Sequence, residues 1–190
     1  TRLILVEAPK RTIITKEKTG LLKEQPRIVL KNCGFINPEN IDEYIAAGGY
    51  EGIAKALQTM TPEDVVNEIK SSGLLGRGGA GFPTGLKWDF AIKTPGDEKF
   101  VICNADEGEP GTFKDRLILE GDPHKLIEGM LIAGYAIKGT RGFVYIRGEY
   151  GLSIERIEKA ILDARSYGLL GKNILESNFS FDISVMKGAG

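Results

Sequence analysis

The chain of 190 residues predicts an α/β fold built on a parallel sheet that is covered by helices on both faces. Two observations carry this prediction. From Lys99 onward, segments typical of buried strands alternate with amphipathic helical segments, and such alternation requires right-handed crossovers between parallel strands. The segment before this point has short helical patterns and charged, irregular stretches instead. The sequence therefore predicts a small helical and irregular N-terminal segment followed by the sheet.

The N-terminal segment is assigned to residues 1–72. Extended pieces are expected at 3–6 and 27–30, and helices at 41–47, 50–58 and 61–72. The last helix has the clearest start, because Thr61 suits the N-cap, Pro62 the first helical position and Asp64 a capping box. We expect these helices to pack on the main body of the protein.

Residues 73–190 are assigned to the α/β domain. Its strands are expected at 100–103, 142–146 and 181–186, and its helices at 123–138 and 153–167. The second helix has the plainest pattern, with apolar residues at helical spacing from Ile154 to Ala164. Ligands of such sheets bind outside the carboxyl ends of the strands. The loop after the first strand is therefore the first place to look for a site.

Composition narrows the classes of function. The net charge of −1 provides no basic surface for nucleic acid, and no apolar run reaches the roughly 18–20 residues of a membrane span. No signal peptide is visible, and the two cysteines, Cys33 and Cys103, indicate a reducing compartment. A disulfide between them stays open at this point. The single histidine, His124, follows Asp-Pro, where surface or capping use is expected rather than catalysis.

A glycine loop is the most unusual feature of the chain. Residues 76–87 read GRGGAGFPTGLK, in which glycines allow close approach to the backbone and Arg77 and Lys87 add positive charge. The pattern G-x-G-x-x-G is present at Gly76, Gly78 and Gly81, but it follows a predicted helix where a Rossmann turn needs a strand. No Gly-Lys-Ser/Thr of a Walker A loop follows. By itself the segment is either an anion-binding loop or a flexible connector.

A second loop, Asn104–Arg116, follows the first predicted strand and gathers carboxylates, a carboxamide and nearby cations. Carboxylates accept hydrogen bonds from ribose, ribityl or ring N–H groups and repel phosphate. A solvated turn remains the alternative for any one of these residues. Phe82, Trp88 and Phe90 lie in or after the glycine loop, where an aromatic ring of a ligand can stack on them. For Trp88 a place in the core is preferred.

The two loops together carry a specific resemblance. GRGGAGFPTGLKW followed by ICNADEGEPGTFKDR resembles the flavin-binding subunit of respiratory NADH dehydrogenase (complex I) and its relatives in NAD-linked hydrogenases and formate dehydrogenases. The similarity spans about Arg27 to Gly190, and RIVLKNCGFINPENIDEYIAAGGYEGIAKAL is most similar to the hydrogenase-type members. The resemblance implies a Rossmann-like core in which NADH passes a hydride to FMN and electrons leave through Fe–S clusters.

Site residues follow from this resemblance by motif position. It implies FMN contacts from Gly76, Arg77, Gly78, Lys87, Asn104, Asp106 and Glu107. It implies NADH contacts from Gly79, Ala80, Phe82, Phe90 and Glu109. No side chain is assigned as a catalytic acid, base or metal ligand, because the flavin performs the chemistry.

The family continues after Gly-Ala-Gly with a Tyr, paired glutamates and, later, four cysteines that hold an Fe–S cluster. This chain contains none of these, so the α/β domain is expected to be truncated on its C-terminal side and any 4Fe–4S cluster to lie in the missing region. The expected partners are a thioredoxin-like Fe–S subunit and further subunits of a redox complex. The expected location is cytoplasmic, either soluble or peripheral to the membrane through those partners.

Two other functions are considered. The first is a non-catalytic assembly module that binds the Fe–S partner, and the second is a phosphoryl-transfer enzyme that uses the acidic loop for Mg²⁺. Missing Walker and kinase motifs disfavour the second. The choices between NADH and NADPH, and between complex I and hydrogenase members, stay open from the sequence.

Overall fold

The structure is a computed structural model that describes residues 26–189. The chain divides into two compact units, Thr1–Lys31 and Asn32–Gly190. The extended piece expected at residues 3–6 lies outside the described residues. The strand expected at 27–30 is wrong, because residues 26–30 form an irregular stretch followed by a bend and turns. A run of three apolar residues, Ile28 to Leu30, is too short to distinguish a strand from a turn without a pairing partner.

The second unit is built on a parallel sheet of three strands in the order β1-β2-β3. Strand β1 spans Phe100–Ala105, β2 spans Arg141–Arg147 and β3 spans Asp182–Gly188. Phe100 pairs with Arg141, which in turn pairs with Asp182. The predicted α/β class and all three predicted strands are therefore confirmed, and their carboxyl ends meet at one edge of the sheet.

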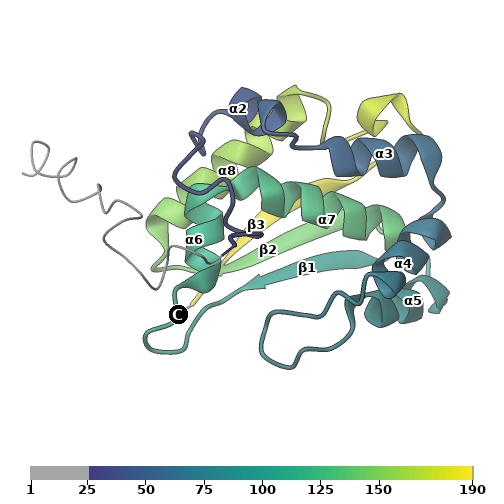
Figure 1. The fold of residues 1–190 in the computed structure, drawn as a ribbon, viewed down its shortest axis with the longest axis horizontal. Coiled ribbons are helices and arrows are strands. Elements are labelled where there is room, and N and C mark those ends of the chain that lie inside the picture. The colour runs from purple at the N-terminus through teal and green to yellow at the C-terminus, as the bar shows by residue number, and fades with distance from the viewer. Residues whose placement is uncertain (1–25, 190) are drawn as a thin grey trace, which may run out of the picture. The chain divides into compact units, whose positions relative to one another are not determined.

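Helices lie against this sheet in the arrangement that Figure 1 shows. Helices α7 (Pro123–Ile137) and α8 (Gly151–Ser166) connect the strands and confirm the two predicted crossovers. Helices α2 (Ile41–Ala46), α3 (Glu51–Thr59) and α6 (Lys114–Gly121) lie on the same side of the sheet (Figure 1). Helices α4 (Pro62–Ser71) and α5 (Thr84–Lys93) lie beside the end where β1 begins (Figure 1). A short 3₁₀ helix, η2, spans Ile174–Glu176.

The core fills the space between the sheet and α7 and α8. Side chains that are almost completely buried come from both helices and from the inner face of the sheet, and include Ile127, Leu131, Val144, Ile146, Ile157, Phe181 and Ile183. Two glycines make room for Phe181. A Cβ on Gly134 would lie 2.5 Å from the Phe181 ring, and one on Gly142 would lie 3.0 Å from it. Glycine is required at both positions by packing.

The opposite face of the sheet is uncovered within residues 26–189. Side chains alternate along a strand, and the residues that point away from α7 and α8 remain exposed. Ile102 is 68% exposed and Met186 is 51% exposed, and Phe100 and Tyr145 are exposed as well. The prediction of helices around a parallel sheet is confirmed, but the described helices that cover the sheet lie over one face rather than both.

Two helices within the second unit do not appear among those expected from the sequence. Helix α5 begins directly after Pro83 and has a weak apolar stripe, so its pattern does not stand out. Helix α6 begins at Lys114, inside the segment expected to be a loop, and its N-cap residue Phe113 makes no side-chain cap. By contrast, the capping box of α4 is confirmed, since Thr61 Oγ1 accepts from the Asp64 N–H and the Asp64 carboxylate accepts from the Thr61 N–H.

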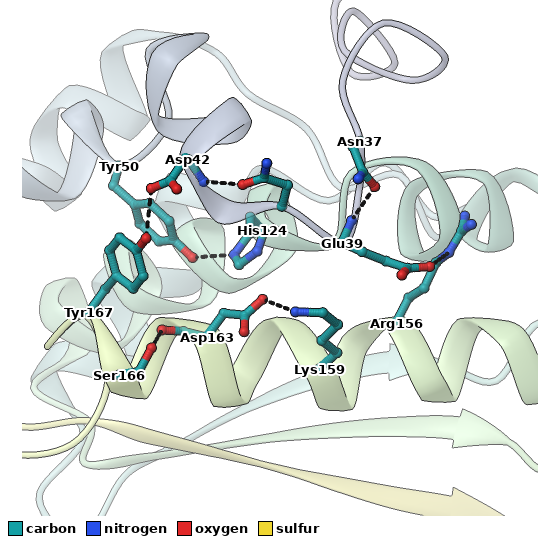
Figure 2. Close-up of polar contacts among 11 residues, drawn as sticks. Asn37, Glu39, Asp42, Tyr50, His124, Arg156, Lys159, Asp163, Ser166 and Tyr167 are labelled. Atoms are coloured by element: carbon teal, nitrogen blue, oxygen red, sulfur yellow. Dashed lines mark hydrogen bonds and ion pairs between the residues drawn. The ribbon is translucent and has the colours of Figure 1, made fainter.

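A polar junction joins α2 and the turn before α3 to α7 and α8, as Figure 2 shows. His124 is 1% exposed, and its Nδ1 lies 2.8 Å from the Tyr50 hydroxyl. The expectation of surface or capping use for His124 is therefore wrong, because the N-terminal helices cover the start of α7. Tyr167 donates to the Asp42 carboxylate at 2.7 Å across the same junction. Cys33 and Cys103 are not joined by a disulfide.

Within the part of the chain that the structure describes, no helix has the length and apolar character needed to cross a bilayer.

Candidate functional site

The glycine loop has a closed base and an exposed tip. The Gly76 N–H donates to the Phe82 carbonyl at 2.9 Å, and the Thr84 N–H donates to the Leu74 carbonyl at 2.9 Å. These bonds tie the loop between α4 and α5, while residues 77–80 at its tip are exposed. Gly79 and Gly81 have φ angles of 117° and 62°, which favour glycine. The predicted helix before the loop is present, so this is not a standard Rossmann turn.

Gly78 requires a different explanation. Its φ does not lie in the left-handed region, and a Cβ built on it would meet no atom within 4 Å. The fold of this chain therefore does not require glycine at position 78. Gly85 provides the contrast, because its Cβ would lie 2.4 Å from the Lys70 backbone nitrogen. The absence of a side chain at Gly78 keeps the backbone accessible to a group from outside.

A cavity of about 450 Å³ separates the glycine loop and α5 from β1 and α7. Its lining comprises Gly76, Phe82, Thr84, Lys87, Trp88, Ala91, Phe100, Val101, Ile102, Ala133 and Ile137. The cavity brings three of the predicted contact residues, Gly76, Phe82 and Lys87, to the side of β1. Asn104 follows Ile102 by two positions and therefore lies on the same face of the strand.

The aromatic residues of this region differ in exposure. Phe82 is 46% exposed and Phe90 is 56% exposed, so both are available to a ligand. Trp88 packs against a small apolar cluster around Val65 and Val66, which agrees with the place in the core that the sequence favoured.

The loop after β1 presents polar groups at the carboxyl end of the strand. The Asn104 side-chain oxygen accepts from the Asp106 N–H at 3.1 Å, which turns the chain out of the sheet. The side chains of Asn104, Asp106 and Glu109 are exposed, as is Arg77 at the tip of the glycine loop. Exposed carboxylates at this edge are able to accept hydrogen bonds from hydroxyl or N–H groups of a ligand.

Glu107 is the exception in this loop, because it is only 3% exposed. Its carboxylate accepts from the backbone N–H groups of Asp115 at 2.9 Å and Arg116 at 3.3 Å, at the start of α6. The Tyr150 hydroxyl donates to it at 3.2 Å. Burial alone would raise the pKa of Glu107, but these hydrogen bonds outweigh it and lower the pKa below its usual value. Glu107 thus supplies the N-terminal cap that α6 lacks locally.

The end of β2 adds residues that the sequence analysis missed. Arg147 Nη1 donates to the Glu107 carbonyl at 2.7 Å. The Tyr150 ring has the guanidinium groups of Arg116 and Arg147 each 5.6 Å from its centre. The run Arg-Gly-Glu-Tyr, which begins at the last residue of the second strand, was an available signal, since the carboxyl ends of neighbouring parallel strands lie together.

The chemistry of these groups fits a flavin nucleotide. Open backbone at the glycine loop, with Arg77 and Lys87, suits a phosphate. Asn104 and Asp106 suit hydroxyl groups and the polar edge of a ring. The cavity beside β1 is mainly apolar in its lining, as a flat ring system needs.

Comparison with known proteins gives the family. The sequence profile of the Nuo51 FMN-binding domain matches residues 69–190. The chain belongs to this family. This Nuo51-type chain is 62% identical over 168 residues to the NADP-reducing hydrogenase subunit HndC of Solidesulfovibrio fructosivorans. The alignment covers 88% of this chain and 34% of that protein. The predicted family resemblance is confirmed.

Other relatives support the same family assignment. The F subunit of the NADH-quinone oxidoreductase of Aquifex aeolicus is 52% identical over 86% of this chain and 38% of its own length, and that of Escherichia coli (strain K12) is 50% identical over 80% and 35%. A crystal structure of an NAD⁺-reducing [NiFe]-hydrogenase, in the air-oxidized state, aligns with a TM-score of 0.64 and 28% identity over 96% of this chain and 31% of that chain. The Nuo51-type chain spans about a third of the length of these relatives.

Proposed function

We propose that this chain binds FMN and NADH, and that a hydride passes between them while electrons leave singly to Fe–S clusters outside the chain. The observation that carries the proposal is the open glycine loop, which borders a cavity against β1 in a chain of an FMN-binding family. A loop whose glycines are not all required by its own fold is expected where a ligand approaches the backbone.

One set of residues contacts FMN and another set contacts NADH. The FMN phosphate is bound by Gly76, Arg77, Gly78 and Lys87. The uncharged polar groups of FMN donate hydrogen bonds to Asn104 and Asp106. NADH is contacted by a second set of residues, with a phenylalanine beside the adenine ring: Gly79, Ala80, Phe82, Phe90 and Glu109. When bound, FMN supplies the hydride-accepting chemistry. The side chains bind and orient, and none needs to act as a general acid or base.

The relatives support a place in a larger assembly. One is named as a hydrogenase subunit and others as NADH-quinone oxidoreductase subunits. We infer partners that include a thioredoxin-like Fe–S subunit, and a cytoplasmic protein that is soluble or held at the membrane by those partners.

An FMN titration of the purified protein tests the proposal. We expect flavin fluorescence to be quenched on binding, and the bound flavin to bleach when NADH is added without oxygen. NADPH is tested in parallel, to decide which of the two nucleotides reduces the flavin. If neither this chain nor a form extended to the length of its relatives takes up FMN, the proposal is wrong. Metal-dependent nucleotide hydrolysis would favour phosphoryl transfer instead.

The assembly module remains a second candidate, favoured by the exposed apolar side chains of Phe100, Ile102, Tyr145 and Met186 on the outer sheet face. If the chain is an assembly module, a purified thioredoxin-like Fe–S subunit is expected to bind it equally well with and without FMN. Binding of that subunit together with flavin reduction by NADH would favour the enzyme.

A further inference from the structure

The loop between β1 and α6 has one internal anchor. Within residues 106–113, Glu107 is buried, Thr112 is half-buried and the others are exposed. Both the backbone and the side chain of Glu107 are held. Arg147 binds its carbonyl, while Tyr150 and the first turn of α6 bind its carboxylate. The loop is therefore attached at this point to the turn that follows β2.

The groups that hold Glu107 are themselves fixed. Arg147 pairs with Glu149 at 3.3 Å, and Arg116 pairs with Glu120 at 2.8 Å. The Tyr150 ring lies against both guanidinium groups, and these contacts favour the ring orientation in which its hydroxyl donates to Glu107. A charged hydrogen-bond network that is internally satisfied orders the segment it contacts.

We propose that Arg147 and Tyr150 are positioning residues for the cofactor loop. By holding Glu107 inward they fix the exposed Asp106 and Glu109 on either side of it, which face FMN and NADH in the function proposed above, on which this inference rests. In this role Glu107 acts through the loop, in addition to any direct contact with FMN.

Hydrogen exchange of the FMN-free protein tests the anchor directly. In the Tyr150→Phe variant, we expect the Asp115 and Arg116 amides to exchange about tenfold faster, since one hydrogen bond to their acceptor is lost. Arg147→Lys keeps the charge but loses the planar fork, and we expect a similar change. Tyr167→Phe is the matched control, because it removes a tyrosine–carboxylate hydrogen bond far from this loop in sequence. It should leave these amides unchanged.

FMN affinity tests the consequence. We expect the Kd for FMN to rise about three- to tenfold in Tyr150→Phe and Arg147→Lys but not in Tyr167→Phe, although Tyr150→Phe and Tyr167→Phe lower the unfolding temperature similarly. Unchanged exchange at Asp115 and Arg116, or an equal acceleration in β3, would overturn the anchor. Faster exchange with an unchanged Kd would overturn the positioning role. If neither this chain nor its extended form binds FMN, the proposed function fails, while the exchange data still test the anchor.

Discussion

Among single residues, the structure separates glycines that packing requires from one, Gly78, that packing does not require. Gly134 and Gly142 make room for Phe181, and Gly85 lies against the backbone of α4. Gly78 meets no such neighbour, although it belongs to the same glycine-rich run as Gly85. The sequence alone does not distinguish these glycines, because it does not show which atoms fill the space where a side chain would lie.

Gly78→Ala tests this distinction. The added methyl group meets open space, so we expect the free energy of unfolding to change by less than about 1 kcal/mol. We expect FMN affinity to fall about tenfold, since the methyl group blocks approach to the backbone. Thermal unfolding and an FMN titration measure the two effects. Gly85→Ala is the control and should lose about 1–3 kcal/mol of stability by overpacking. Unaltered FMN affinity in Gly78→Ala would remove this residue from the site.

Among the helices and strands, two helices receive their N-terminal caps from other parts of the chain. Helix α6 is capped by Glu107, eight residues before Asp115. Helix α3 follows Tyr50, which has a φ of 64° and no cap of its own. The carboxylate of Glu128 on α7 accepts from the backbone N–H groups of Tyr50, Gly52 and Ile53 and from the Tyr44 hydroxyl. A cap of this kind stabilises the helix and also the packing of the helix against the segment that supplies the carboxylate.

Glu128→Ala should therefore be costly. It removes the cap of α3 and leaves the largely buried Tyr44 hydroxyl without its acceptor, and we expect a loss of about 2–4 kcal/mol in the free energy of unfolding. Denaturant titration followed by circular dichroism measures it. Glu155→Ala, on the exposed side of α8, is the matched control and should change stability by less than about 0.5 kcal/mol. Equal effects of the two substitutions would contradict the capping role.

The sheet permits a second comparison between elements. Ile102 lies on the uncovered face and is 68% exposed, whereas Ile183 on β3 is completely buried. Replacing each with threonine keeps a β-branched residue. We expect Ile102→Thr to change stability by less than about 0.5 kcal/mol, and Ile183→Thr to lose about 2–4 kcal/mol by burying a hydroxyl and leaving a cavity. A large loss in Ile102→Thr would mean that its face is covered in solution.

In the molecule as a whole, folding places His124, at the start of α7, against Tyr44 of α2 and Tyr50 before α3. Burial lowers the pKa of His124 from 6.5 to about 4, so the folded protein holds it neutral. Its Nε2 is buried without a hydrogen-bond partner among the described residues. Between these two pKa values the unfolded chain binds a proton that the folded chain does not, and stability therefore rises with pH across this window.

The pH dependence of unfolding tests this state. As the pH falls from 7 to 4, His124 is expected to contribute a loss on the order of 3 kcal/mol, developing below about pH 6.5. Carboxylates also titrate in this range, so the measurement is the difference between the natural chain and His124→Gln. We expect the variant to be less stable at pH 7 and to have a shallower slope. Identical slopes would show that His124 is accessible to protons in the folded state.

The α/β class, the three strands, the crossover helices α7 and α8 and the capping box of α4 could all be predicted from the amino-acid sequence. These features depend on periodicity and local hydrogen bonds, which neighbouring residues carry. The paired loops were also sufficient for the family, because glycine and acidic motifs at that spacing are specific. The folded chain was needed to establish that Glu107 caps α6, that Arg147 and Tyr150 hold it, and that His124 is buried. Those facts depend on contacts between residues far apart in the chain, and a local pattern does not encode which partner a buried polar group meets.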